Sequence, residues 1–421
     1  MDESVFFATA VELNRRLLAR EFSAKELTRA FCDRLEKLGP RYNALALTLR
    51  DEAMRAAEQV DAEIKRGRTR GVLHGVPCGV KDLLSVAGRP TVWGARPFAG
   101  QVFGYDATAV RRLARAGAVL TGKLAMVQLA GGGGYRFAAA SVHGPGLNPW
   151  GLDRWAGGSS SGSGAAVAAG LVTFALGSET NGSIVTPSAF CGVTGLRPTY
   201  GLVSRYGAMP LSWTLDKIGP MGRSAEDCGH VLAAIAGGDS ADPGSARKGF
   251  RFAPQFARPP RELTVGYSPA DFGEYADPNV RPALNEALEA IRRMGVKMKE
   301  IELPDLPYSA AISTVISAEA ATVFADIIED GRLNLLNDAR QAAGLRAAME
   351  VSARDYLQAM RVRRLIQQEM SRIFAGVDLI VAPARYGVAP PVKEPLDRPS
   401  GTAGVRQGRG TRAIITAGNL A

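Results

Sequence analysis

The first seventy residues place apolar and polar side chains with the period of an α-helix. Ser23 and Glu26 have the spacing of a capping box, and the apolar-periodic run that follows them ends at Gly39. Residues 51–66 repeat the helical pattern. We therefore expect residues 1–70 to form a helical lead-in to the rest of the chain.

From residue 71 the pattern changes to short apolar runs that glycines separate. We expect a helix that Asp106 caps to end at Gly117 and to lead into a strand over residues 118–121. Ser224 and Asp227 mark the start of a further helix. This alternation is typical of an α/β domain with a mostly parallel sheet, and we assign residues 71–237 to its core.

The segment 238–260 has the glycine, proline, serine and aspartate content of an exposed linker. Beyond it, we expect strands over 263–267 and 296–303 on either side of a helix that follows Asp277. Helices over 309–375 and a strand over 377–381 complete the pattern. Residues 261–421 are therefore predicted to be the rest of the same α/β domain, with a helical subregion.

Composition adds the prediction of a soluble, globular protein. Of the 421 residues, 46% are hydrophobic, and no apolar stretch has the length of a membrane span. The N-terminus lacks the basic and apolar regions of a secretory signal, so we expect a cytoplasmic location. The four cysteines lie far apart without CxxC spacing, which predicts reduced, buried thiols.

Charge and histidine content narrow the possible partners. None of the three histidines has the spacing of a paired metal ligand, so we predict neither a metal nor another cofactor. The net charge is +10, but the arginines are spread along the chain and interleaved with acidic residues. This pattern favours a solvated surface over a nucleic-acid site. The most basic stretch, 361–372, is predicted to be an exposed helical face, with RNA contact as the alternative.

Two familiar motifs fail in their details. Residues 117–123 nearly match a P-loop, but Leu124 stands where a serine or threonine would bind magnesium, so we reject nucleotide binding. Residues 158–162 match the GxSxG pattern of a nucleophile elbow, but the residues before them are typical of a loop, and His230 is the only histidine after them. An α/β-hydrolase mechanism is therefore not expected.

A third segment, residues 157–207, carries serines and glycines within an otherwise apolar sequence. Together with residues 76–82 and 215–221, it closely resembles the amidase-signature family, and weaker similarity extends from about residue 5 to the end. The resemblance implies a large central, mostly parallel mixed β-sheet that helices cover on both faces. It also makes 71–237 the catalytic core.

The resemblance assigns the catalytic roles by motif position. It implies Lys81 as the base, Ser159 as a bridging serine in a cis peptide, and Ser183 as the nucleophile. The two serines are 24 residues apart, in agreement with the family pattern. A serine hydroxyl needs a neighbour that takes its proton, and burial lowers the pKa of a lysine enough for it to do so.

The segment around Ser183 is predicted to stabilise the negative charge of the reaction. Thr180, Asn181, Gly182 and Ser183 would supply successive backbone N–H groups to the developing oxyanion. We expect an acyl-enzyme on Ser183, departure of an amine that is protonated through Ser159 and Lys81, and hydrolysis by water.

Two departures from the family bear on the substrate. Val185 replaces an arginine that can hold a charged group, and four glycines, 131–134, replace the common Met-Gly-Ser-Ser. We assign Gly132, Gly133 and Val185 to substrate binding and expect a wider, less charged pocket. The expected substrates are bulky neutral amides, anilides, esters or carbamates, with urethanes among the carbamates.

Two other functions stay open. The runner-up is a glutaminase subunit of a tRNA-dependent amidotransferase, and the third is a binding protein on a decayed amidase scaffold, which the intact triad disfavours. We expect a monomer or homodimer with no nucleic-acid or membrane partner. Because the sequence stops inside what resembles a late family motif, we also expect the C-terminus to be truncated.

Overall fold

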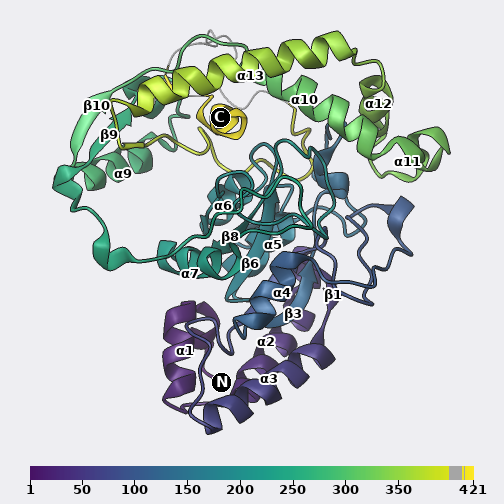
Figure 1. Cartoon of the computed structure of the whole chain (residues 1–421), viewed down its shortest axis with the longest axis vertical. Coiled ribbons are helices and arrows are strands. Elements are labelled where there is room, and N and C mark those ends of the chain that lie inside the picture. The colour runs from purple at the N-terminus through teal and green to yellow at the C-terminus, as the bar shows by residue number, and fades with distance from the viewer. Residues whose placement is uncertain (398–409, 412) are drawn as a thin grey trace. The chain divides into compact units, whose positions relative to one another are not determined.

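The computed structural model describes residues 1–397, 410, 411 and 413–421 (Figure 1). The chain forms two compact units. Unit 1 comprises residues 1–252, 320–346 and 389–396, and unit 2 comprises residues 253–319, 347–388 and the described part of 397–421. The first change of unit, at residues 252 and 253, lies inside the segment 238–260. The division of the chain into a lead-in, a core, a linker and a remainder stays a prediction.

A six-stranded sheet in the order β1-β3-β2-β6-β8-β7 organises unit 1. Its strands are β1 (Leu45–Thr48), β2 (Pro77–Lys81), β3 (Val119–Leu124), β6 (Phe174–Glu179), β7 (Thr194–Gly195) and β8 (Lys217–Gly222). The central strands β3, β2 and β6 are parallel, and β7 runs in the same direction because two antiparallel steps separate it from β6. The predicted fold class, a mixed and mostly parallel sheet with many helices, is confirmed.

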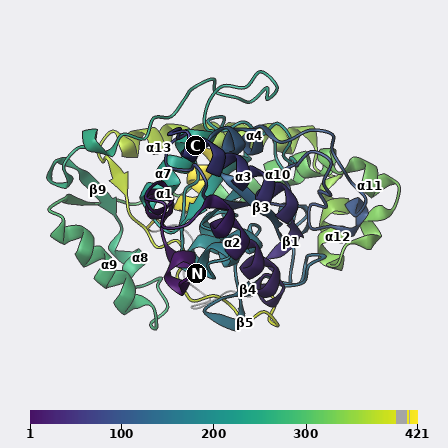
Figure 2. The ribbon, with the colours of Figure 1, turned by 90° about the horizontal axis from the view of Figure 1, so that it is seen from below.

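Helices pack on this sheet, and a two-stranded ribbon of β4 (Leu147–Asn148) and β5 (Gly151–Trp155) lies outside it. The helices up to residue 235 are α1 (Ala10–Leu18), α2 (Ala24–Leu38), α3 (Arg50–Lys65), α4 (Thr108–Arg115), α5 (Ser161–Ala168), α6 (Val185–Cys191) and α7 (Ala225–Ile235). In both views α2 lies beside β1 and β3 (Figures 1 and 2). An apolar cluster that includes Leu35, Leu124, Ala165 and Ala175 joins α2 and α5 to the sheet.

The helix starts follow local capping chemistry in two of the three predicted places. Ser23 and Glu26 form the capping box of α2, and the Ser224 side chain accepts a bond from the Asp227 N–H at the start of α7. The predicted cap of α4 is wrong. Ala107 is the N-cap residue there, and the Asp106 carboxylate instead accepts a hydrogen bond from the Ala87 N–H at 2.8 Å.

Three strands of the unit 1 sheet are buried on both faces. Every residue of β2, β6 and β8 is buried, so each side chain on these strands must be apolar or find a polar partner. The four cysteines, Cys32, Cys78, Cys191 and Cys228, are buried free thiols, as predicted. The buried ends of β2 and β6 carry the polar residues of the candidate site.

Unit 2 contains a three-stranded parallel sheet in the order β10-β9-β11. Its strands are β9 (Thr264–Tyr267), β10 (Lys297–Glu300) and β11 (Leu379–Ile380). α9 (Arg281–Arg293) lies between β9 and β10 in the chain, so the predicted β-α-β unit is confirmed. Tyr267, Phe272 and Leu288 form its buried cluster.

The remaining helices lie between residues 269 and 421. They are α8 (Pro269–Phe272), α10 (Tyr308–Val323), α11 (Ala325–Glu329), α12 (Ala339–Ala348), α13 (Ala353–Phe374) and α14 (Ile414–Leu420). Arg361, Arg364 and Arg372 on α13 are exposed, as predicted. Among the described residues, no helix combines the length and the apolar character needed to cross a membrane.

Candidate active site

Lys81 is the last residue of β2, and its side chain is completely buried. Its Nζ forms hydrogen bonds with the Ser159 Oγ at 2.8 Å and with the Ser178 Oγ at 2.9 Å. Parallel pairing of β2 with β6 brings the ends of both strands to the same edge of the sheet. The geometry therefore joins Lys81 to Ser159, as the sequence predicts, and adds Ser178.

Burial determines the charge of Lys81. Loss of hydration lowers the pKa of its amine to about 7, although the charges of Asp216 and Glu179 oppose this shift. Near neutral pH a substantial fraction of the amine is therefore uncharged, which a general base requires.

Ser159 follows a cis peptide bond between Gly158 and Ser159, which confirms the expected backbone geometry. Its neighbour Ser160 donates a backbone hydrogen bond to the carbonyl oxygen of Ser183 at 3.3 Å. The Ser160 Oγ also lies 3.2 Å from both the backbone N and the carbonyl O of Ser178. These bonds hold the turn that carries Ser159 against the two segments that carry Ser178 and Ser183.

Ser183 lies in the loop between β6 and α6 and is 9% exposed. Gly182 precedes it with a φ of +89°, a conformation that residues with a Cβ rarely adopt. Thr180, Gly182 and Ser183 are buried, whereas Asn181 is exposed. The loop therefore presents a serine hydroxyl next to several backbone N–H groups, and the oxyanion role of residues 180–183 stays a prediction.

Two carboxylates to which the sequence pattern assigns no role, Glu179 and Asp216, support this loop. Glu179 is completely buried and accepts bonds from the N–H groups of Ile184 and Val185 at 2.9 and 3.0 Å, and Arg197 pairs with its other oxygen at 3.3 Å. Asp216 accepts a bond from the Thr180 Oγ1 at 2.6 Å. Glu179 thus fixes the residues after Ser183, and Asp216 fixes those before it.

The residues assigned to substrate binding pack closely. A Cβ on Gly132 would lie 2.9 Å from Leu211 Cδ1, and one on Gly133 would lie 2.5 Å from the carbonyl oxygen of Gln341. The glycines therefore permit a close approach of neighbouring chain segments, a reason that differs from the expected widening of the pocket. Val185 is half-buried at the start of α6. Their part in substrate binding stays a prediction.

A cavity of about 520 Å³ opens beside Ser178 and Thr180. Both residues connect it to the site: Ser178 through its bond with Lys81, and Thr180 through its position in the loop before Ser183. Within the described residues, no group of three or more histidine, cysteine, aspartate or glutamate side chains could hold a metal ion.

Comparison with known proteins agrees with this geometry. The model of the amidase family matches residues 26–406. One glutamyl-tRNA(Gln) amidotransferase subunit, from Gloeothece citriformis, is 35% identical over 415 residues, which cover 93% of this chain and 85% of that protein. The protein of the same name from Moorella thermoacetica is 37% identical over 412 residues, or 91% and 83% of the two chains.

Solved structures give a second comparison. The native peptide amidase from Stenotrophomonas maltophilia superimposes with a TM-score of 0.83 at 31% sequence identity. The match covers 98% of this chain and 88% of that one. Sequence and structure thus agree over nearly the whole length of the molecule.

Proposed function

We propose that this chain, which belongs to the amidase signature family of C–N hydrolases, cleaves neutral amides or carbamates through an acyl-enzyme on Ser183. The observation that carries the proposal is the buried Lys81 amine, with a pKa lowered to about 7 and its Nζ 2.8 Å from the Ser159 Oγ. A neutral amine in this position accepts the proton that a serine nucleophile must lose.

The proposed reaction uses each residue at a stated atom. The Ser183 Oγ attacks the carbonyl carbon, and its proton passes through the Ser159 Oγ to the Lys81 Nζ. Backbone N–H groups of residues 180–183 stabilise the oxyanion. The tetrahedral intermediate collapses as the leaving nitrogen receives the proton back through Ser159. Water then attacks the acyl-enzyme by the same route and releases Ser183.

The preference for neutral substrates rests on Val185. Its backbone N–H is bonded to Glu179, so the residue has a fixed position two places after Ser183, and its side chain offers no charge to a substrate carboxylate or ammonium group. A charged substrate that enters a largely buried site needs a charged partner to offset its lost hydration.

A second candidate function is the glutaminase component of a tRNA-dependent amidotransferase. Its support is the 35% and 37% identity to proteins named as glutamyl-tRNA(Gln) amidotransferase subunits. In that case the substrate is glutamine, a zwitterion, and the chain requires partner subunits for its full activity.

The test is turnover by the purified chain alone of a neutral anilide, an aryl carbamate, an ester and glutamine. Ser183→Ala should lower the rate about 10,000-fold or more, whereas Ser309→Ala, at an exposed serine of α10, should leave it unchanged. Turnover of glutamine alone would favour the second candidate. Equal activity of wild type and Ser183→Ala would overturn the role of Ser183 in both.

A further inference from the structure

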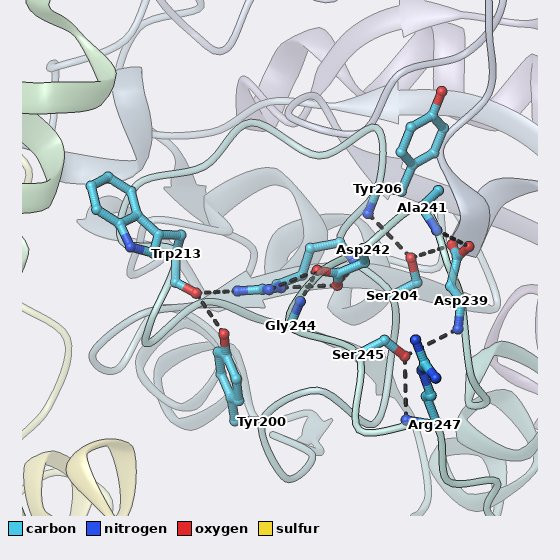
Figure 3. Close-up of polar contacts among 11 residues, drawn as sticks. Tyr200, Ser204, Tyr206, Trp213, Asp239, Ala241, Asp242, Gly244, Ser245 and Arg247 are labelled. Atoms are coloured by element: carbon cyan, nitrogen blue, oxygen red, sulfur yellow. Dashed lines mark hydrogen bonds and ion pairs between the residues drawn. The ribbon is translucent and has the colours of Figure 1, made fainter.

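The cavity beside Ser178 and Thr180 is formed mainly by two stretches of unit 1, residues 200–218 and 241–244. Its volume of about 520 Å³ lies within the range of cavities that hold small organic ligands. Figure 3 shows polar contacts within and between the two stretches, with Tyr200 and Trp213 on one side and Asp242 and Gly244 on the other.

Arg205 links these two stretches. Its Nη2 lies 2.7 Å from the Asp242 Oδ1, and its Nε lies 3.1 Å from the Asp242 Oδ2. Its Nη1 donates to the carbonyl oxygen of Trp213, and its guanidinium lies over the Tyr200 ring, 4.7 Å from the ring centre. All three guanidinium nitrogens of Arg205 therefore bond to groups of the cavity wall, and the positive charge of Arg205 faces the Asp242 carboxylate.

Asp216, the other carboxylate of the cavity wall, also has polar partners. Asp216 accepts bonds from the Thr180 Oγ1 and from the N–H groups of Leu211 and Ser212. Burial raises the pKa of Asp216, and the neighbouring charge of Lys217 opposes that effect. The lining thus contains two cations and two anions, and the remaining groups are apolar, aromatic or uncharged.

Aromatic side chains distinguish this cavity from a simple apolar one. Tyr200, Tyr206 and Trp213 all belong to its lining, as do the apolar residues Met209 and Leu211. Trp213 is 41% exposed, and its backbone carbonyl, rather than its ring, accepts the bonds from Tyr200 and Arg205. The indole ring is therefore available to a ligand, because the bonds that order this segment do not depend on it.

We propose that this cavity binds a neutral aromatic group of the substrate against Trp213, and that Asp242 keeps the cavity from selecting a carboxylate by pairing with Arg205. The inference rests on the proposed amidase function, because it makes the cavity the specificity pocket of that site. Aromatic rings favour stacked or edge-to-face contact with indole, which supplies attraction beyond buried area.

The first test measures binding without turnover. In a Ser183→Ala background, titration calorimetry would compare acetanilide, with its ring on the amine side, and benzamide, with its ring on the acyl side. Trp213→Ala should weaken binding of at least one of them about tenfold, whereas Trp213→Phe should retain most of it. The compound that responds identifies the side of the scissile bond that the cavity serves.

A matched control removes an exposed aromatic ring elsewhere. Phe256→Ala, at a residue 77% exposed, should leave both affinities unchanged. Equal affinity of the Trp213→Ala variant and its parent for both compounds would overturn the proposal. Because this measurement needs no catalysis, its result is separate from the turnover test of the amidase function.

The second test concerns charge. Asp242→Asn leaves Arg205 without its carboxylate, so 4-acetamidobenzoate should gain about tenfold in affinity relative to acetanilide. Adding Arg205→Gln to Asp242→Asn should abolish that gain. An unchanged ratio in the folded Asp242→Asn variant, checked by circular dichroism, would overturn the role of the pair. If that variant does not fold, the Trp213 titrations still decide the proposal.

Discussion

At the scale of single residues, the protonation of Lys81 controls the reactivity of the proposed site. Burial lowers the pKa of this amine from 10.5 to about 7. At pH values between about 7 and 10.5, the Lys81 amine is protonated in the unfolded chain and neutral in the folded chain. This residue therefore makes the folded state more stable as the pH rises from about 7 toward 10.5, and less stable at lower pH.

The same shift predicts the pH dependence of catalysis. We expect kcat/KM to rise about tenfold per pH unit below pH 7 and to level off above it, because the neutral amine is the active form. Lys81→Met should lower kcat/KM by about 100- to 10,000-fold. Rates for wild type and variant across pH 5–9 provide the measurement, and a flat wild-type profile would contradict the role of Lys81.

Ser178 is predicted to position Lys81 rather than to react itself. Its hydroxyl bonds to the Lys81 Nζ at 2.9 Å and favours the charged form of the amine. Ser178→Ala should therefore move the rise of the pH–rate profile to lower pH, by about one unit. Ser163→Ala, at a buried serine of α5 that bonds to the Leu176 carbonyl, should leave the profile in place. A purely structural role for Ser178 would change the rate without moving the profile.

The sequence predicts roles for Lys81, Ser159 and Ser183 because each lies in a contiguous motif. It does not identify Ser178 as a partner of Lys81, although Ser178 stands only five residues before Ser183. That contact depends on β2 and β6 being neighbours, and no local pattern encodes the order of strands in a sheet. The pairing of Arg205 with Asp242 is hidden because it joins two loop segments that lie 37 residues apart in the sequence.

At the scale of elements, close packing explains the glycine run better than pocket size does. Gly133 and Gly134 both have positive φ, +81° and +75°, but their surroundings differ. A Cβ on Gly133 would meet the Gln341 carbonyl oxygen and Leu345 on α12, whereas one on Gly134 would meet nothing within 4 Å.

This contrast gives a matched pair of substitutions. Gly134→Ala should cost about 1–2 kcal/mol of the free energy of unfolding, which is the penalty of the left-handed backbone alone. Gly133→Ala should cost about 1–3 kcal/mol more, because α12 must also move. Urea unfolding of both variants measures the difference, and equal losses would show that α12 does not restrict residue 133.

Local sequence predicts the start of a helix well where the capping side chain has few other hydrogen-bond partners within reach. Ser23 and Ser224 cap their helices as expected, because a serine before an amphipathic run has few competing partners. Asp106 fails because its carboxylate instead binds the Ala87 N–H, from a segment nineteen residues earlier in the chain. The alternation of strands and helices survives such local errors, which is why the fold class is predicted correctly.

At the scale of the whole molecule, the two units are assembled from separate stretches of chain. Unit 1 takes in residues 320–346 and 389–396 as well as the first 252. Sequence patterns mark contiguous ranges and turns between them. Which distant stretches join one unit depends on side-chain contacts between residues far apart in the sequence, which composition does not reveal.

We predict that proteases cleave readily just before residues 252 and 253, where the chain first passes from unit 1 to unit 2. Arg247, Lys248 and Arg251 are exposed and belong to no helix or strand, so trypsin should reach their backbone readily. Cleavage there should precede cleavage at Arg70, whose guanidinium is held by Glu63 and by the Ala114 carbonyl. Mass spectrometry of a brief digest identifies the order, and an earlier cut at Arg70 would contradict it.

The reactivity of the four buried cysteines reports how often unit 1 opens. All four lie in unit 1, and burial raises the pKa of each thiol, so the reactive thiolate is scarce in the folded chain. Alkylating reagents should therefore modify the native chain only as fast as unit 1 opens, and they should be insensitive to motions confined to unit 2. A cysteine introduced on an exposed face of unit 2 would then accept a label at a single position, without removal of the natural four.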